Sequence, residues 1–141
     1  MSFKILIADD EEDIREITLK KLKQEGYTVV GAKDGEEAWK KIKSESPDII
    51  LLDLNMPKMD GLTVLKNLRE NPPSKKWQPV VIISARNELN DVQKGLSLDA
   101  DHYLTKPCHF SDILKAIQLM SGLIPQRKSE LEVKADDKKD H

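Results

Sequence analysis

The sequence contains a single cysteine, Cys108. A disulfide framework within the chain is therefore excluded, and a reducing compartment is favoured. No apolar run approaches the roughly 20 residues that a membrane-spanning helix needs. The first residues hold a short apolar run followed directly by acidic residues, a pattern unlike a signal peptide. These absences predict a soluble, cytoplasmic protein without a membrane partner.

An excess of charge of one sign is also missing. Lys and Arg total 23, Asp and Glu total 25, and the formal net charge is −2. This near balance does not indicate a surface that binds nucleic acid through charge, so no direct nucleic-acid partner is predicted. Solenoid-type repeats are absent as well. A chain of 141 residues is expected to form one domain with a real core.

Short apolar runs alternate with longer amphipathic stretches. The predicted strands are 3–8, 27–32, 48–52, 79–84 and 102–105. The third and fourth runs are continuously apolar, which is typical of strands covered on both faces in a parallel sheet. The predicted helices are 11–25, 35–45, 61–70, 88–98 and 110–122. In the first of these, Ile14, Ile17 and Leu22 lie near one face.

Five strand–helix units predict an α/β fold, a doubly wound five-stranded parallel sheet with helices on both faces. Right-handed crossovers place the carboxyl ends of all the strands at one edge. From Pro125 onward the chain carries five basic and five acidic residues and few apolar ones. We therefore expect a domain over residues 1–124 and a charged, disordered tail over 125–141.

Polar side chains stand where the predicted strands end. Acidic residues 9–12 follow the first strand, Asp53 ends the third, Ser84 ends the fourth and Lys106 ends the fifth. Each has an ordinary explanation: acids favour a helix start, an Asp or Ser caps a turn or helix, and a lysine before proline lies in solvent. Their coincidence at one edge instead favours a ligand site, because ligands bind outside the carboxyl ends of such sheets.

The residue types at this edge suit phosphoryl transfer. Two carboxylates about 4 Å apart repel by roughly 4 kcal/mol at an effective dielectric near 20. Mg²⁺ offsets such repulsion and prefers carboxylate, water and phosphate oxygens. Asp53 is the natural nucleophile, because an aspartate can form an aspartyl-phosphate. Ser84 and Lys106 would then stabilise charge on the transferred group.

Four segments at these positions carry a family resemblance. "ILIADDEEDI", "DIILLDLNMPKMDG", "VIISA" and "YLTKP" occur in this order and together resemble the response-regulator receiver domain of two-component signalling, the CheY-like family. The resemblance extends from about residue 3 to residue 123. It implies a flavodoxin-like (βα)5 fold with strand order 2-1-3-4-5.

The resemblance also implies roles for the carboxylates. Asp53 is similar to the family's phosphoacceptor. Asp10 corresponds to the direct Mg²⁺ ligand, and Asp9 to the residue that acts through a bound water. The backbone carbonyl of Asn55 corresponds to a further metal ligand. Asp9, Asp10, Asp53 and Asn55 are therefore the expected metal site.

Three further residues correspond to those that contact the phosphoryl group in the family or, as Ser84 and Tyr103 do, form its switch. Ser84 is similar to the Thr or Ser that binds a phosphoryl oxygen after activation, and Lys106 to the lysine that contacts the phosphoryl group. The Lys106–Pro107 peptide bond is cis in relatives. Tyr103 corresponds to an aromatic residue that turns inward when Ser84 moves, although a tyrosine on a short strand is also explained by packing alone.

The implied function is a phosphorylation switch. A sensor histidine kinase or a His-containing phosphotransfer domain would donate the phosphoryl group to Asp53 in an Mg²⁺-dependent reaction. The surface of the fourth helix, fifth strand and fifth helix (88–98, 102–105 and 110–122) would then change its affinity for a downstream protein target or an output domain. A homodimer formed on phosphorylation is a further expectation. The chain would catalyse only its own phosphorylation and dephosphorylation, as a stand-alone regulator or as part of a longer one.

Three alternative functions are weighed against this interpretation. An aspartate-nucleophile phosphatase of the haloacid-dehalogenase type would want a second aspartate where Asn55 stands. A flavodoxin-like cofactor binder would want a Ser/Thr/Gly-rich loop where the acidic residues 9–12 stand. A purely structural interaction domain predicts that loss of Asp53 changes nothing.

Overall fold

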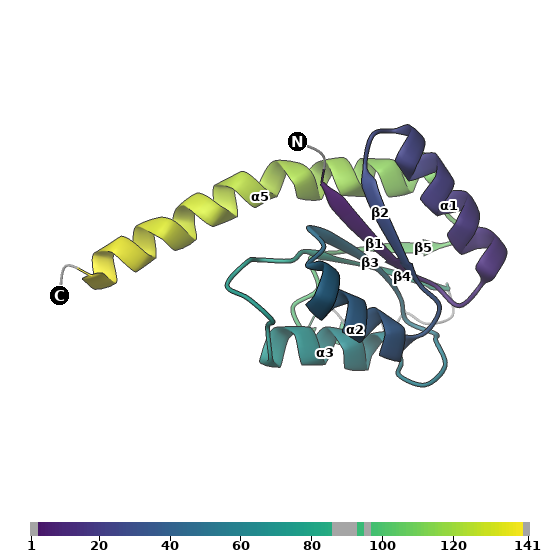
Figure 1. Ribbon diagram of the computed structural model, residues 1–141, viewed down its shortest axis with the longest axis horizontal. Coiled ribbons are helices and arrows are strands. Elements are labelled where there is room, and N and C mark those ends of the chain that lie inside the picture. Colours follow the sequence, from purple (N-terminus) through teal and green to yellow (C-terminus); the bar gives the residue numbers. More distant parts are fainter. Residues whose placement is uncertain (1–2, 86–92, 95–96, 140–141) are drawn as a thin grey trace.

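The computed structural model describes residues 3–85, 93–94 and 97–139. Five strands and four helices are defined within these ranges (Figure 1). They are β1 (Lys4–Ala8), α1 (Glu12–Gln24), β2 (Thr28–Ala32), α2 (Gly35–Glu45), β3 (Ile49–Asp53), α3 (Gly61–Glu70), β4 (Val80–Ala85), β5 (His102–Lys106) and α5 (Phe110–Lys139). Most of the helix predicted over 88–98 lies outside the described residues.

The five strands form one sheet in the order β2-β1-β3-β4-β5, and every neighbouring pair is parallel. This confirms the predicted doubly wound, five-stranded parallel sheet of order 2-1-3-4-5. The strand order reverses between β1 and β3. In such sheets the ligand crevice lies at the carboxyl ends of the strands on either side of the reversal.

The core has two layers, one on each face of the sheet. Leu6 and Ala8 of β1 pack with α2 and α3, while Ile5 and Ile7 of the same strand pack with α1 and α5. Successive side chains of a strand point to opposite faces, so a strand covered on both sides must be apolar throughout. Figure 1 shows α1 and α5 on one side of the sheet and α2 and α3 on the other. The continuous apolar runs of β3 and β4 have this origin.

The buried face of α1 differs from the face predicted from its sequence. Thr18 and Leu22 are the buried residues of this helix. Ile14 and Ile17 are 44% and 56% exposed, so they flank the contact with the sheet instead of filling it. The predicted face included Leu22 correctly but was rotated toward solvent.

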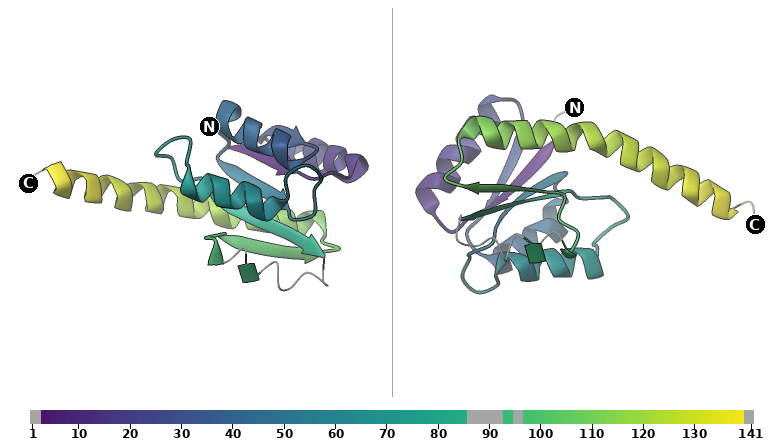
Figure 2. Two further views of the ribbon diagram at one scale, coloured as in Figure 1. Left: turned by 90° about the horizontal axis from the view of Figure 1, so that it is seen from below. Right: turned by 180° about the vertical axis from the view of Figure 1, so that it is seen from behind.

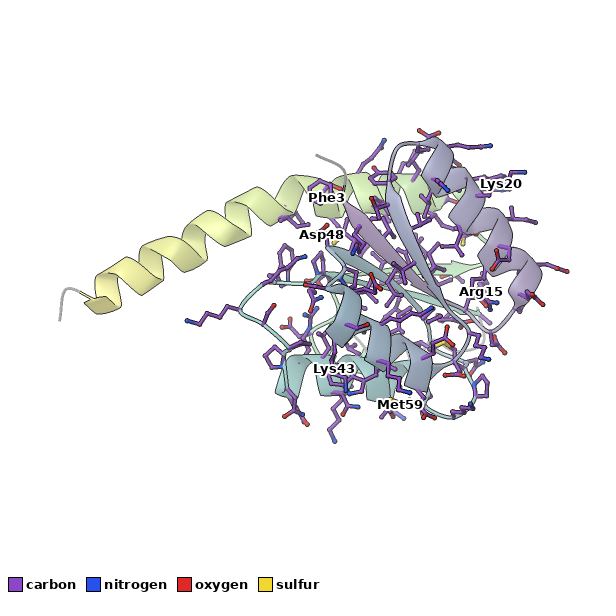
Figure 3. The ribbon with its side chains drawn as sticks, viewed as in Figure 1. Phe3, Arg15, Lys20, Lys43, Asp48 and Met59 are labelled. Carbon is purple, nitrogen blue, oxygen red and sulfur yellow. The ribbon has the colours of Figure 1, made fainter. Side chains whose placement is uncertain are left out.

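Close backbone packing joins β3 to α3. A Cβ atom on Gly61 would lie 2.4 Å from the carbonyl oxygen of Asp53, so glycine is required where α3 begins. The Asp60 side chain accepts a hydrogen bond from the Thr63 amide at 2.8 Å and caps the helix. The connecting loop, which includes Met59, lies at the carboxyl edge of the sheet (Figure 3). Residues that follow Asp53 are therefore held beside it.

Helix α5 is longer than predicted, since it continues past Pro125 to Lys139 instead of ending near residue 122. Its second half projects beyond the sheet (Figures 1 and 2), where the sequence predicts a disordered tail. Ten of residues 126–139 are Lys, Glu, Arg, Gln, Leu or Ala, which are strong helix formers. The domain boundary at residue 124 stays a prediction. Within the described ranges, no helix combines the length and apolar character needed to cross a membrane.

Candidate functional site

Three carboxylates meet at the carboxyl edge of the sheet. Asp9 follows β1 and Asp53 ends β3, and both side chains are buried, at 5% and 4% exposure. Asp10 is exposed beside them. One carboxylate oxygen from each residue lies within 4.8 Å of the other two. The fold thus brings together the three carboxylates that the sequence proposed as metal ligands, from segments more than 40 positions apart.

Lys106 is the cation at the centre of this cluster. Its Nζ lies 2.8 Å from Asp53 Oδ2, 3.6 Å from Asp9 Oδ2 and 3.8 Å from Glu11 Oε1. The Lys106–Pro107 peptide bond is cis, as the resemblance implies. A single ammonium group therefore faces several carboxylates, and the cluster keeps an excess of negative charge.

Burial and pairing act in opposite directions on this ion pair. Burial raises the pKa of Asp53 above its ordinary value, against the hydrogen bond and charge of Lys106, which lower it. For Lys106, burial works to lower the pKa, but the hydrogen bond and charge of Asp53, together with the charges of Asp9 and Glu11, outweigh it and raise the pKa overall. Lys106 therefore remains a cation at neutral pH.

The loops orient the two buried carboxylates in the same way. Asp9 Oδ1 accepts a hydrogen bond from the Glu11 amide at 2.9 Å, and Asp53 Oδ1 accepts one from the Asn55 amide at 3.1 Å. Each is a turn in which an aspartate bonds the backbone two residues on. Because Oδ1 is held by the loop, Oδ2 of each aspartate is the oxygen that faces Lys106.

A polar pocket of about 230 Å³ opens at this point. It is lined by Asp10, Glu11, Asp53, Asn55, Ala85 and Lys106. Oxygen donors of this kind suit a hard divalent cation such as Mg²⁺, and the excess negative charge favours one. Coordination by the carbonyl of Asn55 and the direct and water-mediated roles of Asp10 and Asp9 stay predictions.

Ser84 lies on β4 beside the end of β3. Asp53 pairs in register with Ile83, the residue before Ser84. The Ser84 hydroxyl is fully buried and has no hydrogen-bond partner among the described residues. A buried hydroxyl without a partner is unfavourable, so the site suits a ligand that brings an oxygen acceptor to it. Tyr103 on β5 is 44% exposed, and its inward movement stays a prediction.

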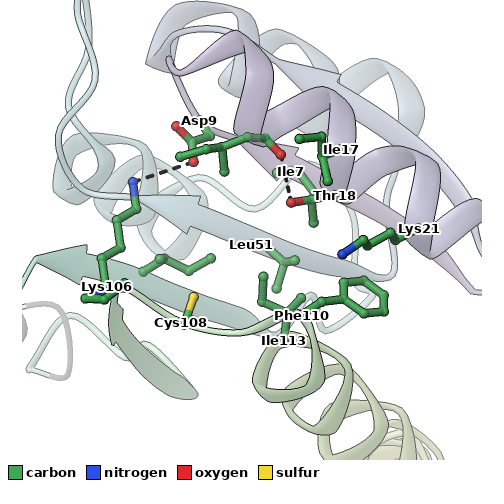
Figure 4. A pocket seen from close by; sticks show the side chains of 13 residues that line it. Ile7, Asp9, Ile17, Thr18, Lys21, Leu51, Lys106, Cys108, Phe110 and Ile113 are labelled. Atoms are coloured by element: carbon green, nitrogen blue, oxygen red, sulfur yellow. Dashed lines mark hydrogen bonds and ion pairs between the residues drawn. The ribbon is translucent and has the colours of Figure 1, made fainter.

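A larger apolar cleft of about 480 Å³ runs from this site between α1 and α5 (Figure 4). Lys106 lies at one end and points toward Asp9, while Lys21 of α1 lies at the other. The Lys21 ammonium is 5.5 Å from the centre of the Phe110 ring, a cation–π contact that connects the two helices. The exposed Ile14 and Ile17 form part of its wall.

Sequence reasoning assigned no role to two residues that contact the site. Glu11 lies within an acidic run, which was the available signal, and the structure places its carboxylate near Lys106. Arg15 donates a hydrogen bond from Nη1 to the carbonyl oxygen of Asp9 at 2.9 Å. No sequence signal separates Arg15 from the other charged residues of α1.

Comparison with known proteins assigns the family. Residues 5–118 match the response regulator receiver domain. The chain belongs to the response-regulator receiver family. It is 46% identical over 107 residues to the alkaline phosphatase synthesis transcriptional regulatory protein PhoP of Bacillus subtilis, an alignment that covers 76% of this chain and 43% of PhoP. It is 37% identical over 136 residues to the response regulator MprA of Mycobacterium ulcerans, covering 96% and 56% of the two chains.

Solved receivers share the fold. The Francisella response regulator 1452 receiver domain is 32% identical, with a TM-score of 0.76, covering 84% of this chain and 96% of that one. The Vibrio cholerae chemotaxis protein CheY4 is 31% identical, with a TM-score of 0.77 and coverages of 85% and 99%. The receiver spans about half the length of the regulators PhoP and MprA that it matches. Membership of the receiver family argues against the two other families considered from the sequence, the phosphatase and the cofactor binder.

Proposed function

We propose that Asp53 accepts a phosphoryl group from the phosphohistidine of a sensor histidine kinase or a His-containing phosphotransfer domain. A carboxylate oxygen of Asp53 attacks phosphorus, the bond between phosphorus and the histidine nitrogen breaks, and the nitrogen leaves with the electron pair. One observation supports this proposal more directly than the others. Asp53 is a buried carboxylate paired with Lys106 at 2.8 Å, in an open pocket with unneutralised negative charge.

The neighbouring side chains have distinct tasks in this reaction. Asp9, Asp10, Asp53 and the Asn55 carbonyl would hold Mg²⁺, either directly or through water. When bound, Mg²⁺ would neutralise charge on the entering phosphoryl group. Lys106 would exchange its contact with Asp53 Oδ2 for one with a phosphoryl oxygen. The buried Ser84 hydroxyl, which lacks a partner among the described residues, would donate to another.

Phosphorylation adds charge and strong acceptors at one end of β3, which is the kind of change that biases a two-state element. Movement of Ser84 toward the phosphoryl group would leave space for the exposed Tyr103 to turn inward. The surface formed by residues 88–98, β5 and α5 would then change its affinity for a partner. PhoP and MprA are longer than this chain, and PhoP is named a transcriptional regulatory protein. The partner is therefore an output domain of a longer regulator or a separate protein, and pairing of two phosphorylated copies is an alternative use of the same surface.

In this proposal the protein acts on its own side chain and not on a separate substrate. Asp53 is consumed as the acceptor and is restored by hydrolysis of its own acyl phosphate, so we propose a switch and not a turnover enzyme. A cytoplasmic location agrees with the single cysteine of the sequence.

The test is intact-protein mass spectrometry after incubation with Mg²⁺ and acetyl phosphate. We expect the wild type to gain one phosphoryl group, and we expect no gain in Asp53→Ala or after removal of metal by a chelator. Asp60→Asn is the matched control, because asparagine caps a helix as well as aspartate does and Asp60 lies outside the pocket.

A second arm covers the case of a short-lived acyl phosphate. Beryllofluoride mimics the phosphoryl group on an aspartate, and its binding is read from amide shifts in nuclear magnetic resonance spectra. Wild-type protein that neither gains mass nor binds beryllofluoride would contradict the phosphorylation switch and favour a structural interaction domain.

A further inference from the structure

Arg15 lies where a charged side chain of α1 is unexpected. Its side chain is only 13% exposed, although most charged residues of this helix face solvent. It lies over β2, where Gly31 has no side chain. A Cβ atom on Gly31 would lie 2.9 Å from Leu19 Cδ1 and 3.5 Å from Arg15 Cδ. A side chain at this position would crowd Leu19, and the stem of Arg15 passes over the glycine at ordinary van der Waals distance.

From this position the guanidinium reaches back along the helix to the acidic loop. Nη1 of Arg15 donates a hydrogen bond to the carbonyl oxygen of Asp9 at 2.9 Å. The Asp9 residue is 5% exposed, so this carbonyl has little access to water. A guanidinium cannot be deprotonated in a protein, and its bond to the carbonyl is charge-assisted.

Three bonds together determine how Asp9 is oriented. Its amide donates to the carbonyl oxygen of Ala32 at 3.0 Å, its carbonyl accepts from Arg15, and its Oδ1 accepts from the Glu11 amide. The remaining carboxylate oxygen, Oδ2, faces Lys106 and lies 3.6 Å from its Nζ. Arg15 is the one of these three partners that acts through a side chain and can be changed by substitution without altering the backbone.

We infer that Arg15 is a positioning residue for the metal site: by holding the Asp9 carbonyl, it keeps the Asp9 carboxylate turned toward Lys106 and the neighbouring carboxylates. This inference rests on the proposed function, because it assumes that these carboxylates bind Mg²⁺. Positioning and simple charge predict opposite results. Removal of a nearby positive charge by itself would strengthen the binding of a cation. Loss of positioning would weaken it, because residues that orient metal ligands typically contribute about 10- to 100-fold to metal affinity.

The experiment is a Mg²⁺ titration of the full chain, by calorimetry and by the amide signals of Glu11 and Asn55. Arg15→Met keeps a long apolar stem over Gly31 but removes the donor and the charge. We expect its dissociation constant for Mg²⁺ to rise about tenfold or more. Arg15→Lys, which can still donate one hydrogen bond to the same carbonyl, should recover part of the lost affinity.

Glu16→Gln is the matched control. It removes the 3.8 Å contact between Arg15 Nε and Glu16 Oε1 without touching Asp9, and its Mg²⁺ affinity should equal that of the wild type. If the methionine variant does not fold, the Mg²⁺ affinity of Arg15→Gln is measured in its place. The shorter glutamine side chain remains polar but does not reach the Asp9 carbonyl. Its affinity should fall in the same way.

Equal or tighter Mg²⁺ binding by the Arg15→Met protein would overturn the inference and leave the proposed function intact. Absence of Mg²⁺ binding in the wild type would overturn both. Weaker binding with unchanged Glu11 amide signals in the metal-free protein would also contradict positioning, because the turn at Asp9 would then have kept its geometry.

Discussion

The amino and carboxyl edges of the sheet use the same residue type in different ways. At the amino edge, Asp48 precedes β3, and its Oδ2 accepts a hydrogen bond from the Lys4 amide of β1 at 2.7 Å. Its Oδ1 lies 2.7 Å from Lys76 Nζ. Asp101 precedes β5 and repeats the pattern, since Oδ2 accepts from the Val80 amide of β4 and from Arg69 Nη2, both at 2.8 Å.

At the carboxyl edge, the aspartates outnumber the cations. Asp9 and Asp53 share one ammonium group, that of Lys106, and the exposed carboxylate of Asp10 lies beside them. The Ser84 hydroxyl beside them has no partner among the described residues. An aspartate next to a strand end thus stabilises the fold where a cation and a backbone amide meet it, and it forms a binding site where they do not. Functional sites often carry such uncompensated charge at a cost in stability.

The largest expected change in folding stability comes from a substitution at the amino edge. Asp101→Ala leaves the Val80 amide without its acceptor and Arg69 without its carboxylate, and both side chains of the ion pair are only 18% exposed. We expect the free energy of unfolding to fall by about 3 kcal/mol, because a backbone amide and a partly buried guanidinium lose the same acceptor. Urea denaturation measures this.

Asp101→Asn is the companion variant, because its amide oxygen can still accept from Val80. It should lose less stability than Asp101→Ala. Phosphorylation of both proteins, measured at a temperature where they are folded, should reach the wild-type level. A loss of phosphorylation in folded Asp101→Asn would show that the two edges are not separate in function.

At the carboxyl edge, we expect removal of an aspartate charge to raise stability. Asp53→Asn removes a buried charge from a cluster that repels it, so the free energy of unfolding without metal should rise by about 1 kcal/mol. Mg²⁺ should raise the melting temperature of the wild type, because a ligand that binds the native state stabilises it. The Asp53→Asn protein should respond much less. A variant less stable than the wild type in metal-free buffer would mean that the pair with Lys106 outweighs the repulsion.

The smallest expected change in stability concerns an aspartate near the carboxyl edge whose two oxygens both have partners. Asp34 caps α2 by accepting from the Glu37 amide at 2.8 Å, and Lys58 lies 3.7 Å from its Oδ2. The hydrogen bond from Glu37 lowers the pKa of Asp34, burial opposes it, and the charge of Lys58 lowers it further. Asp34 thus resembles the amino-edge aspartates, although it follows the carboxyl end of β2.

Because its pKa is lower in the folded protein, ionised Asp34 contributes stability above its ordinary value of 3.8, and this contribution is lost as the pH falls through the folded value. Asp34→Asn keeps the cap but removes the charge. We expect the variant to be slightly less stable than the wild type at neutral pH and equal to it in acid. Urea denaturation across this pH range measures the difference, and a gap that widens toward acid would have the wrong sign.

Much of the fold followed from local pattern. The apolar runs of β3 and β4 indicated strands covered on both faces, and the order of strands and helices indicated a parallel sheet. The order 2-1-3-4-5 came from the family resemblance. The helix pattern of α1 was less informative, because Arg15 is one of its least exposed side chains and Ile14 is exposed. The extent of α5 was also missed, since charged helix formers and a charged disordered tail have similar composition.

The sequence by itself determined which side chains gather at the carboxyl edge, because parallel strands with right-handed crossovers leave no other place for Asp9, Asp53, Ser84 and Lys106. Tertiary structure decided which charges are paired. Lys106 meets Asp53, Arg69 meets Asp101 and Arg15 meets the Asp9 carbonyl, and each contact depends on how far a long side chain reaches across packed elements. Because the strands are parallel, the strand end at which a residue stands sets the edge where it lies, but only the packed side chains set the balance of charge there.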